Sequence, residues 1–236
     1  MNNVRLGAAL TWARASYRVN FLAFVALSLV VTIMSFGQQV VAGPLAETLT
    51  LCLELGSQDQ APNLDLVSQC FSNESSTITL SVFASLFFLV ATFLTTAGVI
   101  RGSLFVTRGR RIGFADTFLG PHFVSFALTV FIIMIVFVAG LFLFVIPAFI
   151  ALVLFQFAPF VALDRGLAPL ASLRASVEIA RRNWSVAILA LLVSAAAYLI
   201  SGLFWGIPTV VALPIAALVT AYVYRLQSGE SVDEFS

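Results

Sequence analysis

The most constraining feature of this sequence is a long apolar run that carries no charge. Between Asp116 and Asp164 there is no Asp, Glu, Lys or Arg. A single helix of that length would measure about 70 Å, more than twice the roughly 30 Å thickness of a bilayer core. The run is therefore expected to fold back once, with spans over residues 118–146 and 147–163. Pro147 suits the first turn of the second span, where its missing N–H breaks no hydrogen bond.

Four further apolar segments complete a membrane architecture. Hydrophobic residues make up 61% of the chain and charged residues 10%, with a mean hydropathy of +1.05, which excludes an ordinary soluble domain. The predicted fold class is all-α: a polytopic integral membrane protein with six transmembrane helices and cytoplasmic amphipathic helices. Residues 78–225 form the five-helix remainder of the bundle after the first span. The four additional spans cover residues 19–41, 78–100, 185–204 and 207–224.

The arginines determine the predicted orientation. All twelve basic residues are Arg, and none falls in the segments expected on the outer side. The positive-inside rule therefore places both termini in the cytoplasm, in a multi-pass protein of the bacterial plasma (inner) membrane. The cytoplasmic segments are residues 1–18, 101–116 and 165–183 and the tail 226–236, with Arg225 directly before the tail.

Two of these cytoplasmic segments have amphipathic patterns. Residues 1–18 interleave arginines with apolar side chains, which suits a helix in the headgroup region or a disordered start. In residues 165–183, Leu170 and Leu173 fall on one helical face and Arg174 on the other. The second pattern fits a helix that lies on the membrane and equally one that docks on another protein.

The segment over residues 42–77 has a different character, because it is polar and acidic and contains no basic residue. It is predicted to be an extracytoplasmic loop. Cys52 and Cys70 lie eighteen positions apart in it, and a disulfide between them would contribute roughly 3 kcal/mol in an oxidising compartment. A protein partner is expected at this loop.

Gln156 is the most polar side chain well inside the central run, and it stands beside Pro159. Pro159 frees the carbonyl of Phe155, and lipid offers that carbonyl no replacement donor. The Gln156 amide is expected to supply one locally or to bind a neighbouring helix; the alternative is a substrate site. Pro147, Gln156, Pro159 and Pro214 are thus the predicted helix-break and packing residues, and Pro214 is expected to kink the last span.

Clusters of arginine in the cytoplasmic segments are candidate contacts for anionic lipid headgroups, at about 1 kcal/mol per charge near the surface. The alternative is that these charges only set the topology. Nucleic-acid binding has no support beyond the same charges, and the sequence does not indicate an oligomeric state. The candidates are Arg108, Arg110, Arg111, Arg174, Arg181 and Arg182.

The combinations of acid, base and nucleophile that common enzyme sites use are missing from this sequence. His122 has no carboxylate, Ser or Cys partner at a recognisable spacing, and there is no Gly-rich phosphate loop. Two Cys and one His make a metal cluster improbable. We therefore expect no catalytic residues, no metal and no cofactor.

Several short motifs resemble one group of six-helix bacterial membrane proteins. They include Thr96 to Gly102 (TAGVIRG), Phe157 to Phe160 (FAPF), Leu163 to Gly166 (LDRG) and Asn183-Trp184. The group is similar to the membrane domain that precedes some glycerophosphodiester phosphodiesterases and to actinobacterial proline- and glycine-rich transmembrane proteins. The resemblance covers about residues 81–225 and implies a six-helix bundle, without a settled activity. This chain lacks a phosphodiesterase domain and a Pro/Gly-rich tail.

These observations predict a non-enzymatic integral membrane protein of the bacterial cell envelope. It would act as an accessory or organising factor that binds lipid or a partner protein, because charge-free spans rich in small residues suit helix packing. The alternative is a small transporter or lipid-handling permease. Its support is the set of proline-interrupted helices around residues 147, 159, 208 and 214, since broken helices often frame substrate sites.

Overall fold

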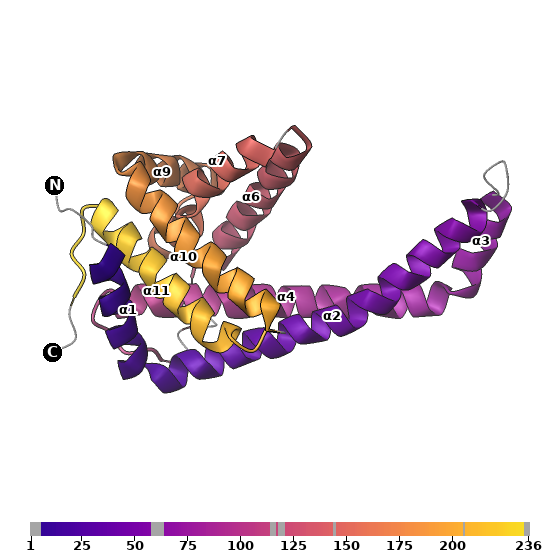
Figure 1. The fold of residues 1–236 in the computed structure, drawn as a ribbon, viewed down its shortest axis with the longest axis horizontal. Coiled ribbons are helices and arrows are strands. Elements are labelled where there is room, and N and C mark those ends of the chain that lie inside the picture. The colour runs from indigo at the N-terminus through magenta and orange to yellow at the C-terminus, as the bar shows by residue number, and fades with distance from the viewer. Residues whose placement is uncertain are drawn as a thin grey trace. The chain divides into compact units, whose positions relative to one another are not determined.

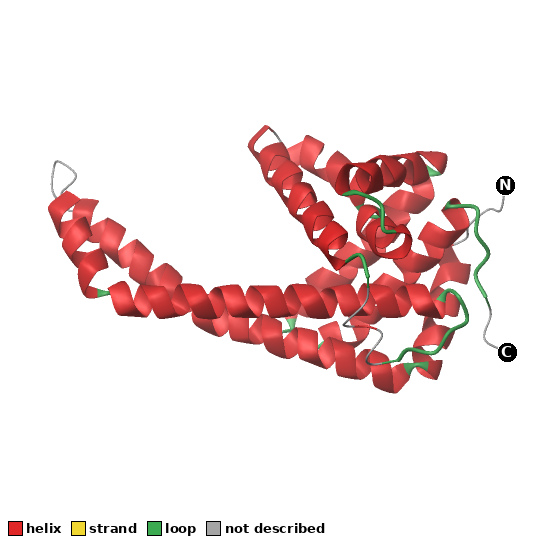
Figure 2. Ribbon diagram, turned by 180° about the vertical axis from the view of Figure 1, so that it is seen from behind, coloured by secondary structure: helices red, strands yellow, loops and turns green. Residues whose placement is uncertain are grey.

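The computed structural model describes residues 6–57, 64–113, 117, 121–143, 145–204 and 206–233. Within these ranges the regular structure is entirely helical, and short loops join the helices (Figures 1 and 2). The helices are α1 (Leu6–Val19), α2 (Phe21–Ser57), α3 (Leu64–Asn73), α4 (Ser75–Val106), α6 (Phe123–Leu143), α7 (Val145–Phe155), α8 (Ala158–Arg165), α9 (Pro169–Arg182), α10 (Trp184–Leu203) and α11 (Thr209–Gln227).

Six of the helical segments are long and apolar enough to cross a membrane, which confirms the predicted all-α polytopic class. Their surfaces are those of a membrane protein, because large apolar side chains such as Leu22 and Phe142 are more than four-fifths exposed. The six segments are Phe21–Glu54, Ser75–Val106, Phe123–Leu143, Val145–Arg165, Trp184–Leu203 and Thr209–Gln227.

The chain divides into two compact units, and the larger one comprises Met1–Leu29 and Thr95–Ser236. In this unit α10 and α11 form one helical hairpin and α6 and α7 another (Figure 1). Helix α8 packs against α6 and α9, and α9 also contacts α7. The α6–α7 hairpin is tight, since a Cβ at Gly140 would lie 2.9 Å from the backbone nitrogen of Ala148. Pro147 lies in the first turn of α7, where the sequence predicted it.

Helix α1 packs its apolar face against the protein. Its amphipathic pattern had suggested instead a helix in the headgroup region, with this face toward lipid. Ala9 and Ala13 are fully buried, and they share one core cluster with Phe24 of α2 and Leu218 of α11. Small side chains at these positions allow the close approach of α1. Trp12 adds an aromatic contact with Tyr222 at 5.2 Å between ring centroids.

Helix α9 buries only part of the apolar face predicted for the segment 165–183, because the packed side is shifted toward its serines. Its buried side chains include Ser172, Leu173 and Ser176, whereas Leu170 is exposed. The Ser176 hydroxyl donates to the carbonyl of Leu154 at 2.6 Å, and such bonds let serine occupy a buried helix face. The pattern placed Leu173 and Arg174 correctly but missed the buried serines, because hydrophobicity does not mark a packed serine.

The smaller unit, Val30–Leu94, consists of the second half of α2, helix α3 and the first half of α4. The segment 42–77, predicted as a loop, is largely helical: α2 continues through Pro44 to Ser57, and α3 follows. Leucines, glutamates and an alanine between residues 45 and 55 are good helix formers, and they continue the helix despite the polar composition of the segment. Cys52 and Cys70 form a disulfide with a Cα–Cα distance of 5.6 Å.

Candidate functional site

The strongest polar cluster surrounds Asp164 in the last turn of α8. Gly166 ends that helix in the left-handed conformation, with φ of 63°, and its N–H donates to the carbonyl of Ala162. The Asp164 side chain is only 3% exposed and pairs with Arg225 at 2.8 Å and with Arg108 at 2.7 Å. It also accepts a hydrogen bond from the Tyr224 hydroxyl at 2.9 Å. Three donors thus compensate one buried carboxylate, as a buried charge requires.

Arg225, in the last turn of α11, connects this carboxylate to other segments. Its Nε donates to the Thr107 hydroxyl at 3.2 Å, and its Nη1 forms an ion pair with Glu230. Glu230 also pairs with Arg165 at 3.4 Å. We call the ends of α4, α8 and α11 that meet in these contacts the basic end of the bundle.

Arg101 lies near the same end on α4 and is 5% exposed. Its guanidinium donates to the carbonyl of Pro121, and no carboxylate of the described residues forms an ion pair with it. His122 follows with φ of 71° and packs directly on Gly166, where a side chain would collide with its ring. The one carboxylate of Asp164 therefore forms ion pairs with Arg225 and Arg108, while Arg101 forms none with the described acids.

A cavity of about 180 Å³ opens beside these groups, and we call it the basic-end cavity. Arg101, Arg108, His122 and Asp164 line it, together with apolar side chains such as Leu104 and Phe105. Guanidinium groups bind phosphate oxygens through charge-assisted hydrogen bonds. The lining thus holds two arginines and one carboxylate, and the carboxylate already pairs with one of the arginines, Arg108.

Of the six arginines predicted as lipid contacts, only Arg108 lines this cavity. Arg110 stacks over the Phe105 ring at 5.1 Å, and Arg182 pairs with Glu178 at 3.3 Å and donates to the carbonyl of Gln227. The others are exposed on the surface: Arg111, Arg174 and Arg181.

Sequence reasoning missed Arg101, Asp164 and Arg225 as site residues. The available signal was that Arg101, Arg165 and Arg225 each stand just after an apolar span. Asp164 stands directly before Arg165. It could be expected to pair with an arginine at the end of another span only if the spans were known to pack together, and the sequence does not show that packing.

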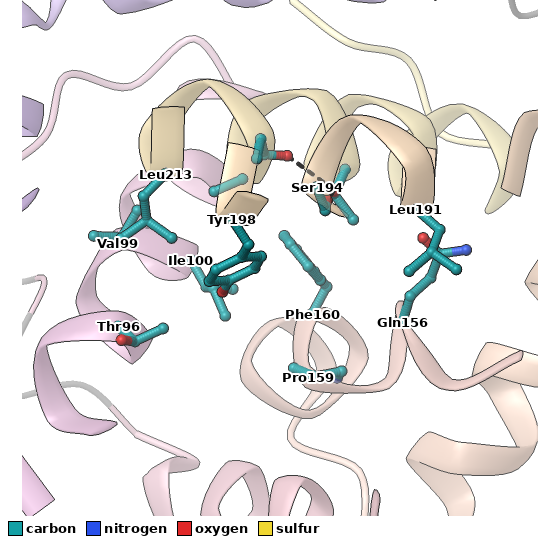
Figure 3. A pocket seen from close by; sticks show the side chains of 13 residues that line it. Thr96, Val99, Ile100, Gln156, Pro159, Phe160, Leu191, Ser194, Tyr198 and Leu213 are labelled. Atoms are coloured by element: carbon teal, nitrogen blue, oxygen red, sulfur yellow. Dashed lines mark hydrogen bonds between the residues drawn. The ribbon is translucent and has the colours of Figure 1, made fainter. Parts of the chain in front are cut away.

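A second cavity, of about 210 Å³, lies among α4, α8, α10 and α11 beside the interruption between α7 and α8. We call it the bundle cavity (Figure 3). Gln156 occupies the interruption, and Pro159 lies in the first turn of α8. The Gln156 amide nitrogen donates to the carbonyls of Val153 at 3.1 Å and Ala187 at 2.9 Å. It thus binds both locally and to a neighbouring helix, at carbonyls other than the Phe155 carbonyl considered in the sequence analysis.

Small residues of α11 provide the room in the bundle cavity. Ala216 and Ala217 line it, and α11 continues as one helix through the buried Pro214. On the wall, the hydroxyls of Ser194 and Thr220 lie 3.4 Å apart (dashed line in Figure 3). No group of three or more His, Cys, Asp or Glu that would suit a metal occurs in the described part of the chain.

Comparison with known proteins finds similarity along nearly the whole chain. It is 30% identical over 238 residues to the uncharacterized protein Rv2560 of Mycobacterium tuberculosis, covering 97% of this chain and 70% of that protein. The uncharacterized protein Mb2590 of Mycobacterium bovis matches to the same extent. No protein-family profile and no solved structure matches.

Proposed function

Since the chain belongs to the family of the uncharacterized mycobacterial protein Rv2560, we propose its function from its own geometry. It is a non-enzymatic integral protein of the bacterial plasma membrane that binds the phosphate-bearing headgroup of anionic lipid in the basic-end cavity. In this way it serves as an accessory or organising factor. The resemblance of residues 81–225 to the membrane domain of glycerophosphodiester phosphodiesterases is part of this proposal and supports a bundle without hydrolytic machinery.

The proposed orientation has the basic end and both termini in the cytoplasm. All twelve basic residues lie in the segments assigned to that side, and arginine is strongly retained on the cytoplasmic side of membrane proteins. The smaller unit is then extracytoplasmic. Its polar segment, residues 42–77, carries acidic side chains and no basic one, which favours a partner of positive charge.

The observation that carries the lipid proposal is the buried guanidinium of Arg101. A charge removed from water is stabilised by a counter-charge, and the described residues supply Arg101 with a carbonyl only. A lipid phosphate in the basic-end cavity would supply that counter-charge. Arg108, whose side chain is 48% exposed, lines the same cavity and would add a second contact.

Arg101→Gln is expected to weaken the retention of phosphatidylglycerol by about ten- to a hundredfold, because one buried charge-assisted contact contributes about 1.5–3 kcal/mol. The measurement is native mass spectrometry of the protein released from nanodiscs that contain phosphatidylglycerol and phosphatidylcholine. The matched control is Arg174→Gln, since Arg174 is exposed and outside the cavity.

Equal losses for the two variants, or none for Arg101→Gln, would reject a specific headgroup site. The same spectra, recorded from native membranes, report any bound protein. A partner that disappears when residues 43–77 are replaced by a short linker would support the accessory role.

The interruption between α7 and α8 favours a second candidate function, a small transporter or lipid-handling permease. Gln156→Leu separates the two. A transporter is expected to lose flux at a normal protein level, whereas a packing role predicts lower thermal stability, because the carbonyl of Ala187 loses its side-chain donor. The two readouts are transport in proteoliposomes and thermal unfolding of the same preparation.

A further inference from the structure

We propose that the bundle cavity binds an uncharged, single-chain lipid that carries a hydroxyl group. The cavity is separate from the basic-end cavity and none of its lining residues is charged among the residues described. The inference is therefore independent of the proposed headgroup site. It names a ligand for the part of the bundle where α7 and α8 are interrupted.

The walls of the bundle cavity are elongated. On α10 the lining residues Leu191, Ser194 and Tyr198 recur at helical spacing, and those of α11 do the same from Leu213 to Thr220. Seven residues of helix correspond to about 10 Å. In Figure 3 Gln156 lies at one end beside Leu191, and Leu213 lies toward the other end. The walls are mainly apolar, with the Gln156 amide at one end and hydroxyl groups such as those of Ser194 and Tyr198 along the length, so they fit one hydrocarbon chain that carries a hydroxyl.

The cavity wall offers several hydrogen-bond acceptors, and the Tyr198 hydroxyl, which can donate or accept, lines it as well. Both donor hydrogens of the Gln156 amide are directed to the carbonyls of Val153 and Ala187, and its oxygen accepts from none of the described residues. The Ser194 hydroxyl donates to the carbonyl of Ala190 at 3.1 Å, and the Thr220 hydroxyl donates to the carbonyl of Ala216 at 2.9 Å. The two oxygens lie 3.4 Å apart, and each keeps lone-pair capacity for a further donor.

These acceptors select the class of ligand. A plain hydrocarbon would cover them without donating a hydrogen bond, which is costly in a water-free environment. An ionised carboxylate or phosphate would find no described cation in the wall. A hydroxyl can donate to Gln156, Ser194 or Thr220 and can also accept, so a long-chain alcohol or another neutral hydroxylated lipid matches the wall.

The test uses the intact chain in nanodiscs and a dodecanol probe that carries a diazirine on its chain. After photolysis, labelled residues are mapped by mass spectrometry. We expect labels within residues 96–100, 191–198 and 213–220, and about tenfold less labelling with excess 1-dodecanol, whereas dodecane at the same mole fraction has less than a twofold effect. Equal competition by dodecane, or labels spread over the exposed face of α6 at residues 131–142, would overturn the proposal.

Variants give a second, independent readout. Ala217→Phe fills the cavity and is expected to abolish labelling there, whereas Ala196→Phe, on an exposed face of α10, leaves it unchanged. If Ala217→Phe lowers the yield of folded protein, Thr220→Val tests the same point, because it keeps the side-chain shape and removes an acceptor. It should reduce the preference for dodecanol over dodecane several-fold, and an unchanged preference would contradict hydroxyl recognition. Arg174→Gln, at an exposed position outside both cavities, is expected to leave the preference for dodecanol over dodecane unchanged.

Discussion

Asp164→Leu is expected to destabilise the bundle by about 3–5 kcal/mol, the usual effect of removing one partner of a buried ion pair. The leucine would remove the buried carboxylate that pairs with the 3%-exposed side chain of Arg225, leaving that arginine only the more exposed Glu230, and would remove the acceptor of the Tyr224 hydroxyl. The measurement is the thermal unfolding of the detergent-solubilised protein, together with its yield. Glu178→Gln is the control: its ion pair with Arg182 is exposed on both sides, so little change is expected.

A double variant distinguishes charge imbalance from loss of packing at Asp164. In Asp164→Leu combined with Arg225→Met, neither buried charge remains, and Glu230 keeps Arg165 as a partner. Removal of both partners of a buried pair is often near neutral, so the double variant should recover a large part of the lost stability. A double variant that is as unstable as the sum of the two single variants would contradict the ion-pair explanation.

Replacing both Cys52 and Cys70 by Ala is expected to lower the stability of the smaller unit by about 2–4 kcal/mol. The disulfide closes a segment with a sequence separation of 18, and both cysteines belong to Val30–Leu94. Hydrogen exchange should therefore accelerate in α3 and in the second half of α2, while the amides of α10 and α11 keep their protection.

The wild-type protein provides the control for the cysteine variant. A membrane-impermeant reductant applied to intact cells should open the disulfide and reproduce the faster exchange if the smaller unit is extracytoplasmic. Resistance in intact cells, followed by reduction after lysis, would contradict the proposed orientation. Faster exchange throughout the larger unit would show that the effect of the disulfide is not local.

The membrane-crossing helices were predictable because each depends on one contiguous apolar run. The fold-back of the segment between Asp116 and Asp164 followed from length alone. The helical extension of α2 beyond Pro44 was not predictable in this way, since a polar composition is compatible with a loop as well as with a solvated helix. The disulfide needed only the spacing of two cysteines and an oxidising location.

The basic end could not be derived from the sequence, because its contacts join residues far apart in the chain. Arg108 lies 56 positions from Asp164, and Arg225 lies 61 positions from it. No helical or strand period relates such positions, and the packing of α4, α8 and α11 brings them together. For the same reason, the exposed clusters around residues 110 and 181 were easier to identify than the buried Arg101.

The ion pairs of Asp164 also bear on how the protein is synthesised. During synthesis α8 emerges well before α11, so Asp164 initially has Arg108 near it but not Arg225 or Tyr224. The buried arrangement is complete only when the end of α11 arrives and Arg225 bonds to Asp164 and Thr107. Until then the α4 and α8 ends retain a polar surface that favours water and the membrane boundary. A chain that ends before Tyr224 would therefore leave Asp164 with Arg108 as its one described donor, so the final helix supplies two of the three groups that compensate this carboxylate.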